Sequence, residues 1–62
     1  MENLTKIELQ NIKKIIQAHE TLYQKLSTYA LQAVDPQIKQ IFTKSAQDSI
    51  NVKQKLMTFL TE

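Results

Sequence analysis

Apolar side chains recur every three or four residues through the first half of the chain, and this spacing predicts a helix over residues 5–34. Thr5 and Glu8 have the spacing of a capping box, and Leu4 and Leu9 occupy the positions of a hydrophobic staple, so we expect the helix to begin at Thr5. The expected seam residues are Leu9, Ile12, Ile16, His19, Tyr23, Leu26, Ala30 and Ala33.

A second apolar line accompanies this seam. Ile15, Leu22 and Tyr29 each lie one position before a seam residue, which widens the apolar stripe beyond what two packed helices need. A stripe of this width is typical of a helix that contacts two neighbours, as in a four-helix bundle.

Asp35-Pro36 interrupts the pattern just past the middle of the chain, in a sequence with one proline and no glycine. Proline is tolerated at the first position of a helix but not in its interior, and Asp35 is a favoured N-cap residue. A second helix is therefore expected over residues 36–61. Its expected seam residues are Ile38, Phe42, Ser45, Ser49, Val52, Leu56 and Phe59.

These elements predict an all-α fold: one helical-hairpin domain over residues 1–62, with two antiparallel helices of similar length. A single hairpin would leave the second apolar line in water, so we expect two copies to form a four-helix bundle. The expected interface residues are Ile12, Ile15, Ile16, Leu22, Tyr23, Leu26, Tyr29, Ile41, Phe42, Val52, Leu56 and Phe59.

The composition of the chain limits the kinds of partner that we expect. The chain has no cysteine, so neither disulfides nor thiolate metal sites are available to stabilise its 62 residues, and oligomerisation is the remaining remedy. Its net charge is +2 and its sequence lacks arginine, the residue favoured for recognising guanine edges and phosphates, so we expect no nucleic-acid partner. No apolar run is long enough to span a bilayer, and the N-terminus lacks the pattern of a signal peptide, so we expect a cytoplasmic location or one derived from it.

His19 is the only histidine, and it falls on the core side of the first helix. It could be a metal ligand or pH switch, with Asp48 as a second ligand across a dimer, or a histidine hydrogen-bonded to Asp48, Asn51 or a Ser or Tyr hydroxyl. We favour the second interpretation, because one histidine per chain supplies too few ligands for a metal.

Other catalytic arrangements are not supported. A di-iron bundle requires Glu-x-x-His, which the chain lacks, and Glu20 points away from the adjacent His19. Ser45 and Ser49 have no base nearby except His19. Lys53 and Lys55 are expected on a solvated face. We therefore expect no enzymatic activity and no cofactor.

Three short motifs carry a family resemblance: Leu26-x-x-Tyr29-Ala30, then Asp35-Pro36-Gln37-Ile38-Lys39, then Ile41-Phe42-x-x-x-Ala46-Gln47, with His19 ahead of them. With these, the chain resembles the short members of the bacterial spore coat protein F family. The resemblance implies a ferritin-like hairpin fold, deposition in or around spores, other coat proteins as partners, and a packing role without established catalysis. The family often has a histidine near the position of Asp48 to Asn51, which this chain lacks, so no metal ligands carry over.

Three hypotheses on function follow. The first is a structural protein of the spore coat or its precursor layers that works as a homodimeric four-helix bundle. The second is a ferritin-like metal- or ligand-binding bundle that uses His19 and Asp48. The third is a small regulatory protein that docks its helical face on a larger partner.

Overall fold

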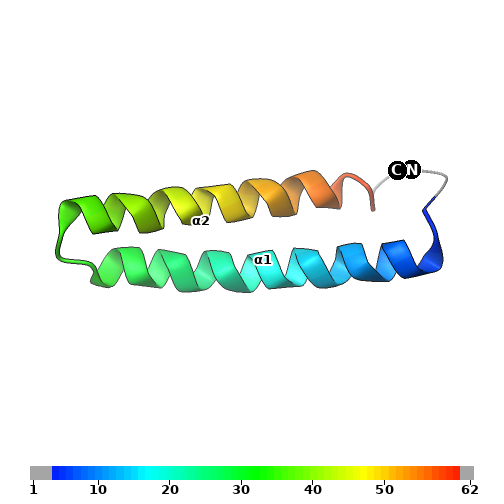
Figure 1. Cartoon of the computed structure of the whole chain (residues 1–62), viewed down its shortest axis with the longest axis horizontal. Coiled ribbons are helices and arrows are strands. Elements are labelled where there is room, and N and C mark those ends of the chain that lie inside the picture. The colour runs from blue at the N-terminus through cyan, green and yellow to red at the C-terminus, as the bar shows by residue number, and fades with distance from the viewer. Residues whose placement is uncertain (1–3, 61–62) are drawn as a thin grey trace.

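The computed structural model describes residues 4–60, which form two helices, α1 (Lys6–Gln32) and α2 (Pro36–Met57). The helices lie antiparallel as a hairpin, with the connection at one end (Figure 1). The Cα atoms span 46 × 14 × 12 Å, so the molecule is a thin rod. The predicted helical hairpin is confirmed.

Helix α1 begins at the capping box that the sequence predicts. The Thr5 hydroxyl accepts a hydrogen bond from the Glu8 backbone N–H at 3.0 Å, and the Glu8 carboxylate accepts one from the Thr5 N–H at 3.1 Å. These bonds satisfy two of the backbone donors that a helix start leaves without partners. The bond from the Thr5 backbone N–H also holds the pKa of Glu8 below its ordinary value, because it favours the ionised carboxylate, and the Thr5 side chain acts in the same direction.

Helix α1 ends two residues earlier than predicted. Ala33 is its C-cap and has extended backbone angles, and its N–H donates to the Tyr29 carbonyl at 2.9 Å. The prediction that the helix reaches residue 34 was wrong, because the chain needs an extended connection before it can reverse direction. Asp35, the residue before the proline, is itself excluded from helical geometry.

Helix α2 begins as predicted at Pro36. One carboxylate oxygen of Asp35 accepts hydrogen bonds from the backbone N–H groups of Gln37 at 2.7 Å and Ile38 at 3.3 Å. The helix ends at Met57, where Thr58 is the C-cap and its hydroxyl donates to the Lys55 carbonyl. The prediction of a helix to residue 61 was thus too long, and residue 61 itself lies outside the described residues.

The seam of α1 follows the predicted positions: each is buried or half-buried, from Leu9 to Ala33. The seam of α2 differs at two of the predicted positions, because Ile38 and Val52 are exposed while Ala46 is buried and Lys53 half-buried.

The small Ala46 lies between the helices and allows close approach of α1, so the seam of α2 runs through Ala46 and Lys53 and leaves Ile38 and Val52 outside it.

Candidate interaction surface

The contact between the two helices buries little side-chain surface. Of residues 4–60, only Ala30, Ala46 and Ser49 are less than 9% exposed, and none of the large side chains among them is fully buried. Ser49 donates its hydroxyl hydrogen to the Ser45 carbonyl at 3.0 Å, so its polar atom is satisfied within α2. The innermost layer is therefore built from small side chains, which bring the helices close together but contribute little apolar area.

One side of the hairpin is marked by an ion pair between the helices. The Lys53 ammonium donates to the Glu20 carboxylate at 2.8 Å, and both side chains are only partly exposed. This bond lowers the pKa of Glu20 from its ordinary value of 4.5, with the nearby Lys53 charge acting in the same direction and partial burial opposing it. The prediction that Lys53 lies on a solvated face was wrong, because its aliphatic stem lies in the seam and its charge is paired.

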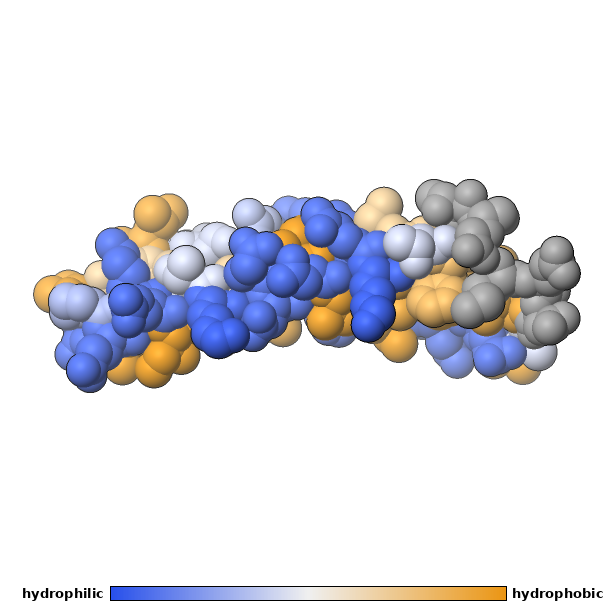
Figure 2. Space-filling model, turned by 90° about the horizontal axis from the view of Figure 1, so that it is seen from above, coloured by the Kyte–Doolittle hydropathy of each residue, from blue (hydrophilic) through white to orange (hydrophobic). Residues whose placement is uncertain are grey.

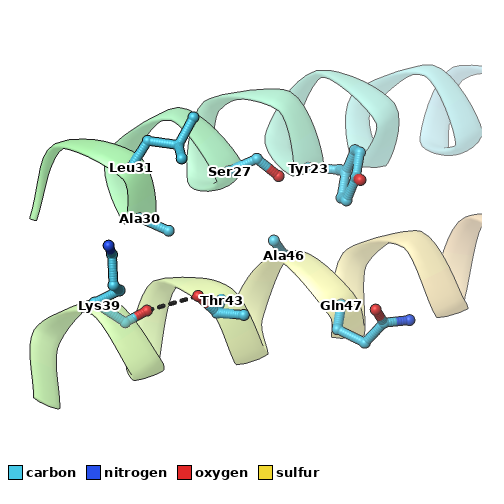
Figure 3. A pocket seen from close by; sticks show the side chains of 8 residues that line it. All are labelled: Tyr23, Ser27, Ala30, Leu31, Lys39, Thr43, Ala46 and Gln47. Carbon is cyan, nitrogen blue, oxygen red and sulfur yellow. Dashed lines mark hydrogen bonds between the residues drawn. The ribbon is translucent and has the colours of Figure 1, made fainter. Parts of the chain in front are cut away.

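The same side carries an open depression. Figure 3 shows Ala30 and Ala46 pointing toward the facing helix at its base, with the Thr43 hydroxyl bonded to the Lys39 carbonyl at 2.8 Å on its rim. The depression is lined by Tyr23, Ser27, Ala30 and Leu31 of α1 and by Lys39, Thr43, Ala46 and Gln47 of α2. Its lining includes no carboxylate or imidazole that would serve as a general base. We call this side of the hairpin the polar face.

The opposite side carries the second apolar line. On α1, residues seven apart lie almost above one another, so Ile15, Leu22 and Tyr29 form one row on the side of the seam away from Glu20 and Ser27. All three are exposed, Leu22 by 43%.

On α2, Ile38, Ile41 and Val52 occupy the corresponding side, away from Lys39 and Lys53, and all three are also exposed. The Tyr29 ring crosses toward α2 here and meets the Phe42 ring, with centroids 5.6 Å apart.

We call the surface formed by these rows the apolar face; its exposed members are Ile15, Leu22, Tyr29, Ile38, Ile41 and Val52. Figure 2, which looks onto α2, shows hydrophilic side chains along the outward ridge and hydrophobic side chains gathered mainly along one edge. The hairpin thus has one predominantly polar and one predominantly apolar broad side. A contiguous exposed apolar patch on a small protein usually marks an interface.

The predicted interface residues fall into two groups. Five of them lie exposed on the apolar face: Ile15, Leu22, Tyr29, Ile41 and Val52. The other seven are half-buried in the seam of their own hairpin: Ile12, Ile16, Tyr23, Leu26, Phe42, Leu56 and Phe59. The seam group supports the apolar face from beneath.

His19 and Asp48 are not joined in the structure. The Nδ1 atom of His19 lies 3.0 Å from the Ile15 carbonyl oxygen, one turn back in the same helix, in place of the partners considered from the sequence. Asp48 is exposed and pairs with Lys44 at 3.6 Å. Within residues 4–60, no three His, Cys, Asp or Glu side chains are grouped so that they could hold a metal ion.

Comparisons with known proteins find no match: neither family models, curated proteins nor solved structures show significant similarity to this chain. Among the described residues, neither helix has an apolar stretch long enough to cross a bilayer.

The link between Glu20 and Lys53 predicts a specific pH dependence. The carboxylate has a lower pKa when folded, so its ionised form stabilises the fold above its ordinary pKa of 4.5, and that contribution is lost as pH falls through the folded pKa. The Glu20→Gln variant should be less stable than the wild type at pH 7, and the difference should shrink as pH is lowered below 4.5. Urea unfolding across this range measures it, at one fixed protein concentration.

Lys53→Met is the matched variant, because it keeps most of the aliphatic stem and removes the charge. It should show the same narrowing, while the contribution of Glu8, present in all three proteins, cancels in the comparison. A gap between wild type and Glu20→Gln that stays constant from pH 7 to pH 3 would contradict the role given to this ion pair.

Proposed function

We propose that this chain is a non-catalytic structural protein that works as a homodimer, in which two hairpins pack their apolar faces together as a four-helix bundle. The observation that carries the proposal is the contrast between the two kinds of surface. The seam buries no large side chain fully among residues 4–60, while six large apolar residues stand exposed together on one side.

The composition of the apolar face favours a second copy of the chain as its binding partner. The rows on α1 and α2 are both apolar and run along the same side of the rod, so two identical faces are complementary in chemistry and length. The net charge of +2 is too small to oppose self-association strongly. A closed two-fold pair is also the commonest arrangement of soluble oligomers.

A structural role, in place of a catalytic one, is supported by the small number of reactive side chains among the described residues. His19 is held through Nδ1 to its own helix, and Asp48 is paired with Lys44 on the surface. The depression on the polar face carries only Lys39 as a charged group. No observation in this arrangement supports the metal-binding hypothesis.

Two matched leucine substitutions test the dimer. Leu22 lies on the apolar face, and Leu31, which is 81% exposed, lies on the polar face. Full burial of a leucine contributes about 1.5–3 kcal/mol, and Leu22 is 43% exposed in the hairpin, so its two copies contribute about 1–3 kcal/mol to a dimer and Leu22→Gln should raise the dissociation constant about tenfold or more. Leu31→Gln should leave it unchanged. Sedimentation equilibrium measures both.

Equal effects of the two substitutions would mean that the apolar face is not the interface. A wild-type chain that stays monomeric and instead captures one defined larger protein through Leu22 would favour the regulatory hypothesis.

Placement of this dimer in the spore coat rests on the resemblance of the hinge and its flanking motifs, including Asp35-Pro36 and Tyr29-Ala30. If the chain is a coat component, its transcript should be absent during growth and appear during sporulation in its source organism. A transcript time course measures this. Steady expression in growing cells would contradict the coat role and leave the dimer intact.

A further inference from the structure

His19, the single histidine of the chain, lies between the seam and the apolar face. Ile15, four residues before it, and Leu22, three residues after it, are exposed members of the apolar face. Ile16 and Tyr23, three residues before it and four residues after it, are half-buried in the seam. Residues three and four apart are neighbours on a helix surface, so these four side chains surround His19 on α1. A partner that covers both Ile15 and Leu22 therefore covers His19 as well.

The two nitrogen atoms of the His19 ring have different surroundings. Nδ1 lies 3.0 Å from the Ile15 carbonyl oxygen. Because a carbonyl oxygen only accepts, Nδ1 carries the hydrogen of the neutral ring, and Nε2 is left as an acceptor. Among residues 4–60, no protein group bonds to Nε2, and no side-chain nitrogen or oxygen is both enclosed and without a partner. Nε2 is therefore open to water in the single hairpin and can take up a proton there.

The charged groups around His19 include no free carboxylate that would stabilise a protonated ring. The ion pair of Glu20 with Lys53, at 2.8 Å, places Lys53 of α2 close to the level of His19 along the rod. The titratable groups within five residues of His19 on α1 and of Lys53 on α2 are Lys14, Glu20, Tyr23, Asp48, Lys53 and Lys55. Only two of these are carboxylates, and both are already paired with lysines, Asp48 with Lys44 at 3.6 Å.

We infer that protonation of His19 weakens the proposed dimer, so that the pairing of the two hairpins responds to pH; this inference rests on the proposed function. In the separated chains Nε2 is open to water, and the protonated ring is hydrated. In the dimer the ring lies between two apolar faces, where an unpaired charge is far less favourable than a neutral ring. The separated chains therefore bind more protons than the dimer, and the dimer loses stability as pH falls through the range in which histidine titrates.

The size of the effect follows from the presence of two histidines in each dimer. A histidine side chain ordinarily takes up its proton near pH 6.5, so at pH 5.5 about ten such side chains in water are protonated for each neutral one. A dimer that excludes both protons would have a dissociation constant about a hundredfold higher at pH 5.5 than at pH 8. Incomplete exclusion of water from the interface lowers this value, so we expect a rise of at least about tenfold.

The hydrogen-bonded carboxylates of the hairpin stay ionised throughout this pH range. The bond from the Thr5 backbone N–H lowers the pKa of Glu8, and the bond from the Lys53 side chain lowers the pKa of Glu20, both from the ordinary value of 4.5. The capping box and the ion pair between the helices are therefore intact at pH 5.5 as well as at pH 8. A change in association between these two pH values does not come from their loss.

Sedimentation equilibrium at pH 8 and pH 5.5, at one ionic strength, tests this on the wild type, on His19→Gln and on His19→Leu. Neither substituted side chain titrates, so the dissociation constant of each variant should change by less than about twofold between the two pH values, while that of the wild type rises. The two variants are independent, so one that does not fold leaves the other to decide. As a matched control, His19→Gln combined with Gln17→His moves the histidine to an exposed position about 160° around α1 from Ile15. This control should be as insensitive to pH as His19→Gln.

A wild-type dissociation constant that is the same at the two pH values would overturn the inference and keep the dimer. A dimer that tightens at pH 5.5 would overturn it as well, because the protonated ring would then be stabilised across the interface. A pH response that persists in His19→Gln and His19→Leu, or that returns with Gln17→His, would place the responsible proton elsewhere. A wild-type chain of monomer mass at both pH values would instead refute the dimer on which the inference rests.

Discussion

The narrowness of the contact between two helices is the constraint on which this structure depends. Two rods share one seam, and here the middle of that seam is made of Ala30, Ala46 and Ser49, which let the backbones approach but bury little apolar area. Each ordered residue costs about 1.5 kcal/mol of conformational entropy, and a chain of this size with no cysteine to form disulfides offsets that cost only with difficulty. In the proposed dimer, a second copy would cover the exposed apolar face and add the missing buried area.

Local and long-range interactions define different features of the hairpin. The capping box of Thr5 and Glu8 and the cap of Asp35 fix where the helices begin, through backbone hydrogen bonds that any isolated copy would form. The ion pair of Glu20 with Lys53 joins residues 33 positions apart and marks the polar face. The apolar rows of Ile15, Leu22 and Tyr29 and of Ile38, Ile41 and Val52 lie on the other side of the seam.

Much of the fold could be predicted from residue spacing, because caps and periodic apolar positions act locally. The hinge at Asp35-Pro36 and the whole seam of α1 are of this kind. The seam of α2 was harder, since Phe42, Ser49 and Leu56 belong equally to a row with Val52 and a row with Lys53, and only packing against α1 selects the second row.

The partner of Lys53 was missed for the same reason. Counting levels from the hinge would have placed Glu20 within reach once Lys53 was allowed into the seam. The apolar face was partly predictable: the row of Ile15, Leu22 and Tyr29 follows from periodicity, but the exposure of Val52 depends on which row of α2 packs against α1. The most direct measurement of the central claim is the urea midpoint of unfolding at protein concentrations spanning three orders of magnitude, read together with mass by light scattering. An obligate dimer predicts a midpoint that rises with concentration and twice the chain mass; a constant midpoint with the mass of one chain would contradict the account.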